Sequence, residues 1–294
     1  MRVSSAAVDS ADSLRSFGHV FDGVAEAYDA ARPGYPPEIV DAALTRGGLA
    51  PGARVVEVGC GTGKLTELLA ARGLEVDAVD PGPNMIEAAR RRVGDAAHVR
   101  FHVVRFEDAD LPSGAYAALF SATAFHWIDP AVGWRKAAAL LEPGGMLALL
   151  LQTGVRDEES DAFGAEFRAN LRRYAPEVEA TLPRIRGREE LLAGAEARRA
   201  NASGVWDWLM GDAHGLSVPE AADLFADVEV TSRVERITET ADEIAAHLRT
   251  TSLWFRIDPS RRAAFEAGDR RIIERRGGSI TSTRVAVLMT ALRV

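Results

Sequence analysis

The sequence predicts an α/β fold in which helices cover both faces of a doubly wound, seven-stranded and mostly parallel β-sheet. Short runs rich in β-branched residues alternate with segments of helical spacing, and this alternation requires right-handed crossovers between parallel strands. Three closely spaced glycines, Gly59, Gly61 and Gly63, follow the first of these runs. The chain has 294 residues, 47% of them hydrophobic, which is enough for a full core and an attached subdomain.

The expected elements follow one another in a regular order. Two helices come first, and we expect them over the mouth of a ligand site: Phe21–Tyr28 and Pro37–Thr45. Five strands follow, with helical segments between them: Arg54–Val58, Glu75–Asp80, Val99–Val104, Ala117–Phe120 and Met146–Gln152. From Asp157 to about Ala226 helices dominate, which indicates a helical insertion after strand five. The remainder alternates again, with strand six, two helices and a final strand: Val228–Ile237, Ala241–Leu248, Ser260–Arg275 and Ile280–Leu292.

The residues around the glycines predict a site for an adenosine-bearing cofactor. Glycine lets the backbone turn sharply and approach a ligand where a Cβ would collide. Asp80, at the end of the second strand, can accept hydrogen bonds from ribose hydroxyls, or alternatively cap the helix after Pro81. A dinucleotide fingerprint is excluded because it needs its third glycine one position after Gly63. A P-loop is excluded because it needs a glycine where Val58 stands and Ser or Thr directly after Lys64.

The motif Glu57-Val58-Gly59-Cys60-Gly61-Thr62-Gly63 resembles the first motif of the Rossmann-like, S-adenosylmethionine-dependent methyltransferases. Later segments are similar to this family in the same order: Pro81–Arg90, Phe106-Glu107-Asp108, Ser121–Asp129 and Leu141–Leu149. The lead-in Phe21–Pro36 resembles that of the trans-aconitate and ubiquinone/menaquinone-pathway methyltransferases. The resemblance covers roughly residues 17–152. It implies a sheet whose last strand is antiparallel, and methyl transfer from S-adenosylmethionine to a small-molecule metabolite, with S-adenosylhomocysteine as product.

The resemblance also implies a division of the chain into four parts. We expect residues 1–45 to form lead-in helices that act as a lid, and residues 46–154 to form the cofactor-binding core. Residues 155–226 would then form a cap over the acceptor, and residues 227–294 the strands and helices that complete the sheet.

Cofactor contacts are expected, by the same resemblance, from residues in the lead-in, the glycine loop and the ends of strands two to four: Tyr28, Arg32, Glu57, Gly59, Cys60, Gly61, Gly63, Asp80, Pro81, Met85, Phe106, Glu107, Asp108 and Ser121. Several contacts have alternatives. Glu57 either orders the loop or meets the methionine ammonium group. Glu107 or Asp108 accepts the adenine amino group, or the two form a solvated turn. Tyr28 and Arg32 contact the methionine carboxylate, or Arg32 forms a helix-end salt bridge.

Candidate residues for the chemistry and the acceptor pocket lie nearby or in the later helices. His126, where strand four opens into the cleft, could take a proton from a hydroxyl or amine acceptor, or could instead bond to the backbone. Cys60 has no paired base near it in sequence, so we expect a small residue facing the cofactor and not a nucleophile. Tyr35, Trp127, Trp206 and Trp254 are the expected pocket residues, although aromatic clusters more commonly belong to a core.

Composition narrows the partners. The net charge of −8 without a basic block argues against a nucleic-acid substrate, and no apolar run reaches the about 18 residues of a membrane span. A single cysteine and a start without the layout of a secretory signal predict a cytoplasmic protein. The histidines show no metal-ligand spacing, so no metal is expected, and the chain would be a monomer or a homodimer. One alternative stays open: a protein of this fold that binds S-adenosylmethionine or S-adenosylhomocysteine but catalyses another reaction or serves as a partner subunit.

Overall fold

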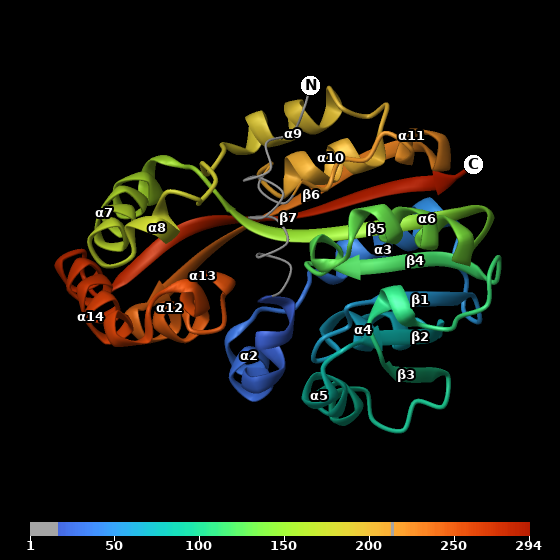
Figure 1. Cartoon of the computed structure of the whole chain (residues 1–294), viewed down its shortest axis with the longest axis horizontal. Coiled ribbons are helices and arrows are strands. Elements are labelled where there is room, and N and C mark those ends of the chain that lie inside the picture. The colour runs from blue at the N-terminus through green and yellow to red at the C-terminus, as the bar shows by residue number, and fades with distance from the viewer. Residues whose placement is uncertain (1–16, 213–214) are drawn as a thin grey trace.

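Seven strands form one mixed sheet in the computed structural model, which describes residues 17–212 and 215–294. The strand order is β3-β2-β1-β4-β5-β7-β6 (Figure 1). The neighbouring pairs among β1 to β5 are parallel, while β7 is antiparallel to both β5 and β6. The predicted fold class is therefore confirmed, including the antiparallel last strand. The strands are β1 (Arg54–Val58), β2 (Glu75–Asp80), β3 (Val99–Val103), β4 (Tyr116–Ala122), β5 (Leu141–Val155), β6 (Phe225–Thr240) and β7 (Ser279–Arg293).

Helices connect the strands and add the predicted insertion after β5. Those up to β5 are η1 (Phe17–Val24), α2 (Ala25–Ala31), α3 (Pro37–Gly47), α4 (Lys64–Ala70), α5 (Pro83–Val93), η2 (Phe106–Asp108), η3 (Phe125–Trp127) and α6 (Pro130–Leu140). The insertion contains α7 (Glu158–Tyr174), α8 (Pro176–Glu179), α9 (Arg188–Glu196), α10 (Ala202–Leu209) and α11 (Ala221–Leu224). Between β6 and β7 lie α12 (Ala241–Leu248), α13 (Ser252–Arg256) and α14 (Pro259–Arg275).

Three expected boundaries were wrong, and each has a physical reason. The first helix is divided into a 3₁₀ helix, η1, and a short α-helix, α2. Strands five and six extend beyond their expected bounds, because their ladders with β7 continue through polar positions such as Thr153 and Glu239. Residues 1–16, the first part of the expected lead-in segment, lie outside the described residues.

Helices bury a hydrophobic core on each face of the sheet. On one face α3, α4 and α5 contribute Ile39, Leu65 and Ile86 to a cluster with the strands. On the other face α6 and α10 contribute Trp134 and Trp206. A third, smaller cluster joins α7, α8, α12 and α14, the group of helices at the left of Figure 1. The helices of the insertion therefore pack in two separate places: α10 packs against the sheet, whereas α7 and α8 pack against α12 and α14.

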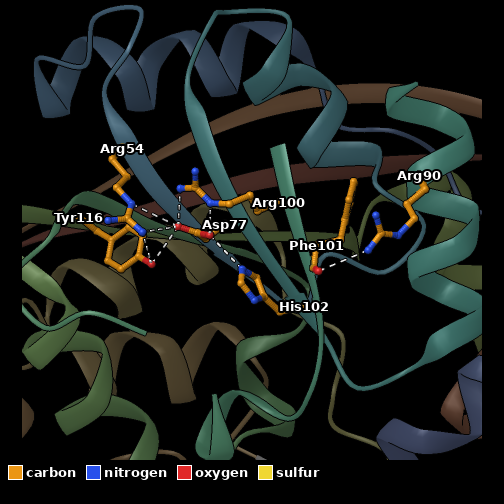
Figure 2. Close-up of polar contacts among 7 residues, drawn as sticks. All are labelled: Arg54, Asp77, Arg90, Arg100, Phe101, His102 and Tyr116. Atoms are coloured by element: carbon orange, nitrogen blue, oxygen red, sulfur yellow. Dashed lines mark hydrogen bonds and ion pairs between the residues drawn. The ribbon is translucent and has the colours of Figure 1, made fainter. Parts of the chain in front are cut away.

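The parallel strands are cross-linked at their amino-terminal half by the carboxylate of Asp77 in β2 (Figure 2). Its side chain is only 2% exposed and accepts hydrogen bonds from Arg54 in β1 (2.9 Å), Arg100 in β3 (2.9 Å) and the Tyr116 hydroxyl in β4 (3.0 Å). His102 Nε2 lies 2.9 Å from the same group. Burial alone would raise the pKa of Asp77, but these hydrogen bonds hold it far below its usual value. This cluster fixes four strands from the side opposite to their carboxyl ends.

Candidate functional site

Two adjoining cavities lie at the carboxyl ends of the parallel strands, where ligands bind in open α/β sheets. The larger has a volume of about 970 Å³ and the smaller about 200 Å³. They share a wall that includes Tyr28, Arg32, Gly59, Gly61 and Thr123. The glycine loop and the lead-in segment therefore border both cavities.

The glycine loop has the backbone conformation that its sequence requires. Gly59, Gly61 and Gly63 have φ angles of 71°, 53° and 83°, in the left-handed region that favours glycine. A Cβ on Gly59 would lie 2.3 Å from the Ala124 Cβ, whereas one on Gly61 would meet nothing within 4 Å. Gly59 thus permits close packing, and the space above Gly61 leaves room for a ligand against the backbone.

Gly63 has a different role from the predicted cofactor contact. It lines neither cavity. It precedes the first residue of α4, and a Cβ there would lie 2.9 Å from the backbone of Ala89 in α5. This glycine lets α4 and α5 pack closely, which is a structural requirement and not a ligand contact.

Asp80 lines the larger cavity and holds two backbone segments beside it. Its carboxylate accepts hydrogen bonds from the N–H of Gly61 (2.9 Å) and of Gly82 (2.8 Å). The alternative, that Asp80 caps α5, is wrong, because Asp22 does so from the lead-in segment. Asp22 Oδ1 accepts hydrogen bonds from the N–H of Asn84 (2.8 Å) and of Met85 (3.2 Å).

Four more of the residues expected as cofactor contacts line the larger cavity. These are Pro81, Met85, Phe106 and Glu107, and Phe106 and Met85 are almost fully buried. Glu107 Oε1 accepts hydrogen bonds from Arg105 (3.0 Å) and the Asp129 N–H (3.2 Å). Burial alone would raise the pKa of Glu107, but these bonds, with one to its own backbone, lower it. Glu107 is therefore an ionised hydrogen-bond acceptor in the lining of the larger cavity.

Asp108 was expected as an equivalent acceptor, and the structure does not place it there. Its side chain is exposed and lines neither cavity, because the 3₁₀ turn η2 directs the two neighbouring carboxylates differently.

Two buried titratable groups of the glycine loop, Glu57 and Cys60, line the smaller cavity. Burial raises the pKa of Glu57 to about 8, and the charge of Asp80 adds to this effect. Glu57 Oε2 is buried without a hydrogen-bond partner among the described residues. Burial also raises the pKa of the Cys60 thiol well above its usual value. Cys60 is therefore a thiol at neutral pH, consistent with the expectation that it is not a nucleophile.

His126 and Trp127, from η3 after β4, line the larger cavity together with Phe21 of η1. The His126 ring is buried and lies against Trp127, with ring centroids 4.5 Å apart. Trp127 in turn contacts Phe21 at 5.8 Å. Phe21 of the lead-in segment therefore contacts Trp127, and Trp127 in turn lies against His126, the predicted proton acceptor.

Tyr35 lines the smaller cavity, where its hydroxyl lies 3.3 Å from Thr123 Oγ1.

Three other expected site residues lie elsewhere. Ser121 is fully buried, and its hydroxyl donates a 2.7 Å hydrogen bond to the Val58 carbonyl, which joins β4 to β1. Trp206, a residue of α10, is fully buried in the core that this helix shares with the sheet. Trp254 packs beside the third hydrophobic cluster and against Arg262. None of the three lines either cavity; Trp206 belongs to the core, whereas Trp254 is only partly buried.

The structure also adds residues that were not expected. Arg284 of β7, His247 of α12 and Gln152 of β5 line the smaller cavity. Gln152 donates a 2.9 Å hydrogen bond to the Gly34 carbonyl. Thr123, after β4, has a φ of 54°, which is uncommon for a β-branched residue and occurs most at functional sites. Of these residues only Arg284 had a signal in the sequence, because it is an arginine within a mostly apolar strand.

Two further observations concern metals and membranes. Across residues 17–212 and 215–294, no group of three or more His, Cys, Asp or Glu side chains is placed to hold a metal ion. In the same part of the chain no helix combines the length and apolarity needed to cross a bilayer.

Comparisons with known proteins agree with this geometry. The family model described as "Methyltransferase domain" matches residues 55–145. An uncharacterised methyltransferase of Mycobacterium tuberculosis is 38% identical over 146 residues, which cover 50% of this chain and 56% of that protein. A ubiquinone biosynthesis O-methyltransferase of Xanthomonas campestris is 37% identical over 127 residues, or 41% of this chain and 52% of that protein. The chain thus spans about half the length of the curated relatives it matches.

A solved structure extends the similarity of fold over most of the chain. A candidate type II methyltransferase from Anaeromyxobacter dehalogenans superposes with a TM-score of 0.55 at 23% sequence identity. The match covers 89% of this chain and 97% of the other.

Proposed function

This chain carries a class I methyltransferase domain, and from that premise we propose that it transfers a methyl group from S-adenosylmethionine to a small-molecule acceptor. The observation that carries the proposal is the larger cavity, where the glycine loop, Asp80 and Glu107 line one space at the carboxyl ends of the strands. Each group suits one part of the cofactor. The glycine loop lets the cofactor lie close to the backbone, Asp80 can accept hydrogen bonds from the ribose, and Glu107 can accept one from the adenine amino group.

The residues present fit the cofactor in three further ways. Glu57 Oε2, buried without a partner among the described residues, can accept a hydrogen bond from an ammonium group in the smaller cavity. The space above Gly61 lets a ligand lie against the loop. Arg32 reaches both cavities from the lead-in and can hold the methionine carboxylate.

The chemistry asks mainly for positioning. When bound, S-adenosylmethionine supplies an activated methyl group on a positively charged sulfur. The protein therefore has to hold the acceptor in line, with reacting atoms about 3–3.5 Å apart, and to exclude water. Phe21, Trp127 and Leu151 give the cavity apolar walls. His126 is the group that can take the acceptor's proton at an oxygen or nitrogen atom.

The size and charge of the site favour a metabolite as acceptor. About 970 Å³ is at the upper end of the volumes typical of small-molecule sites, enough for a cofactor and a small acceptor together. The net charge of −8 does not favour a nucleic acid. We expect a cytoplasmic enzyme that acts as a monomer or homodimer and binds neither nucleic acid nor membrane.

A labelling experiment tests the function. The protein is incubated with methyl-labelled S-adenosylmethionine and a metabolite extract, and small products that gain the label are identified by mass spectrometry. Transfer to a small molecule that is lost in Asp80→Ala supports the proposal. Binding of the cofactor without transfer to any extract component would favour the alternative of a binding protein or partner subunit. Labelling of tRNA, DNA or protein would overturn the small-molecule acceptor.

A further inference from the structure

The smaller cavity contains a half-buried guanidinium, that of Arg32, with no carboxylate partner among the described residues. Arg32 donates hydrogen bonds to Thr250, from Nε to Oγ1 (3.1 Å) and from Nη2 to the carbonyl (2.7 Å). No ion pair between described residues includes Arg32. Burial and the nearby charge of Arg284 lower its pKa, although two tyrosines oppose the effect. The positive charge of Arg32 is thus held in place by neutral groups.

A second arginine, Arg284, lines the same cavity. The side chain of Arg284 in β7 is 15% exposed, and among the described residues its only ion pair is a loose one of 3.5 Å with Glu239. His247 of α12 lies near both arginines: burial first, and then the charges of Arg32 and Arg284, lower its pKa to about 4. His247 is therefore neutral at pH 7 in a strongly positive region.

The other charged groups of the cavity do not balance these two arginines. Lys64 is already paired with Asp29, at 3.4 Å from Oδ1. Glu57 is the only carboxylate among the described lining residues, and its raised pKa, about 8, leaves it mostly protonated at pH 7. Burying charge without a counter-ion is costly, so an arrangement of this kind indicates a site for an anion.

One cofactor carboxylate can satisfy only one of the two guanidiniums bidentately. Arg32 borders the glycine loop and reaches both cavities, so it suits the methionine carboxylate. Arg284 and His247 line only the smaller cavity and lie outside residues 55–145, which form the methyltransferase domain. Elements outside the cofactor core are where an acceptor-specific contact would be expected.

We infer that the acceptor is an anion, with a carboxylate or phosphate group that Arg284 binds in the smaller cavity beside His247. This inference rests on the proposed function and narrows its substrate class. The body of such an acceptor would extend from β7 toward the shared wall of the two cavities, at Gln152 and Thr123. Glu239 competes with the anion for Arg284.

The test measures anion binding after the cofactor site has been filled. S-adenosylhomocysteine is titrated first by calorimetry, and succinate, inorganic phosphate or the uncharged succinamide is then titrated into the saturated protein. We expect one or both anions, but not succinamide, to bind, and the comparison of the two anions to distinguish carboxylate from phosphate. Arg284→Gln should weaken anion binding at least about tenfold while leaving the affinity for S-adenosylhomocysteine unchanged.

Two further variants separate binding from structural damage. Arg233→Gln removes an exposed arginine of β6 that lines neither cavity, and should change nothing. Glu239→Gln removes the acid that competes for Arg284, so it should bind the anion more tightly than the wild type, an effect opposite to that of general destabilisation. Arg284→Lys should recover part of the affinity lost in Arg284→Gln.

The outcomes are distinguishable. If the saturated wild type binds neither anion, or binds succinamide equally well, the inference is wrong. The inference is also wrong if Arg284→Gln weakens the binding of S-adenosylhomocysteine tenfold and leaves anion binding unchanged, because Arg284 then belongs to the cofactor site. If S-adenosylhomocysteine does not bind the wild type at all, the first titration overturns the proposed function itself, before any anion is added.

Discussion

The carboxylate of Asp80 accepts a 2.9 Å hydrogen bond from the backbone N–H of Gly61, across the gap between the ends of β2 and β1. Its other oxygen accepts a hydrogen bond from Gly82. A carboxylate has acceptor positions for ribose hydroxyls in addition to these two bonds. The residue expected to bind the cofactor therefore also fixes the loop on which the cofactor would lie. Replacing Asp80 removes both of these roles at once.

Asp80→Ala should weaken the binding of S-adenosylhomocysteine by ~1–3 kcal/mol, because it removes a buried acceptor and loosens the loop. Isothermal titration calorimetry measures this directly. Asp95→Ala, at an exposed position after α5, is the matched control and should bind as the wild type does. Equal affinities for Asp80→Ala and the wild type would show that the ribose lies elsewhere.

Cofactor binding at pH 7 should release a proton from Glu57. The pKa of this buried carboxyl is about 8 in the unliganded protein, so it is mostly protonated there. An ammonium group beside it favours the ionised form and lowers the pKa. The binding enthalpy should therefore depend on the ionisation enthalpy of the buffer at pH 7, and Glu57→Gln should lose that dependence. A buffer-independent enthalpy in the wild type would contradict the contact between Glu57 and the ammonium.

The same pKa has a consequence for stability. Because the native carboxyl has a raised pKa, its contribution to stability is fully present below the unfolded value of about 4.3 and is lost as the pH rises toward 8. Glu57→Gln should flatten the fall in melting temperature between pH 5 and pH 8 in the unliganded protein.

The lead-in segment should close over bound cofactor. Asp22 fastens η1 to the start of α5, and Lys64 donates a 2.9 Å hydrogen bond to the Asp29 carbonyl of α2. Since this segment roofs the larger cavity, hydrogen exchange of Phe17–Tyr35 should slow when S-adenosylhomocysteine is added, while α14 is unaffected. Asp22→Ala should speed exchange of η1 without ligand. Identical exchange of this segment with and without ligand would refute a moving lid.

Asp77→Asn should destabilise the protein by about 1–3 kcal/mol at pH 7. The range lies below that for a fully buried ion pair because Arg54 and Arg100 are 35% and 48% exposed and can return to water. The lowered pKa of Asp77 means that its contribution is present above pH ~4 and is lost as the pH falls below that value. Urea unfolding should therefore show a difference between variant and wild type that is full at pH 7 and shrinks in acid. A constant difference would mean that packing, and not charge, is responsible.

The sequence predicted best those elements whose signals are local. β1, β2 and α12 begin and end where expected, because each has a hydrophobic pattern and a local boundary signal, such as the glycine that ends β1 after Val58 or the Thr240 capping box that begins α12. The ends of β5 and β6 were missed because pairing with β7, a distant segment, extends them beyond their apolar runs.

The candidate site divides in the same way. Gly59 and Gly61 were found because one motif contains them, and Asp80 because it ends the next predicted strand; all three line the larger cavity. Arg284 and His247 were missed, since only the folded sheet brings β7 and α12 to the glycine loop. The wrong pocket tryptophan, Trp206, shows the converse: its aromatic character could not reveal whether the face of α10 that carries it turns toward the core or the cavity.

The place of β7 between β5 and β6 imposes an order on folding as the chain is synthesised. The first five strands can pair with one another as they emerge, but β5 and β6 each keep an unpaired edge until residues 279–293 have been made. Exposed strand edges are the usual starting points of aggregation and of misplaced pairing between chains. The nascent protein must therefore pass through a long interval with two open edges, and during that interval a chaperone that covers edge strands would have most to contribute.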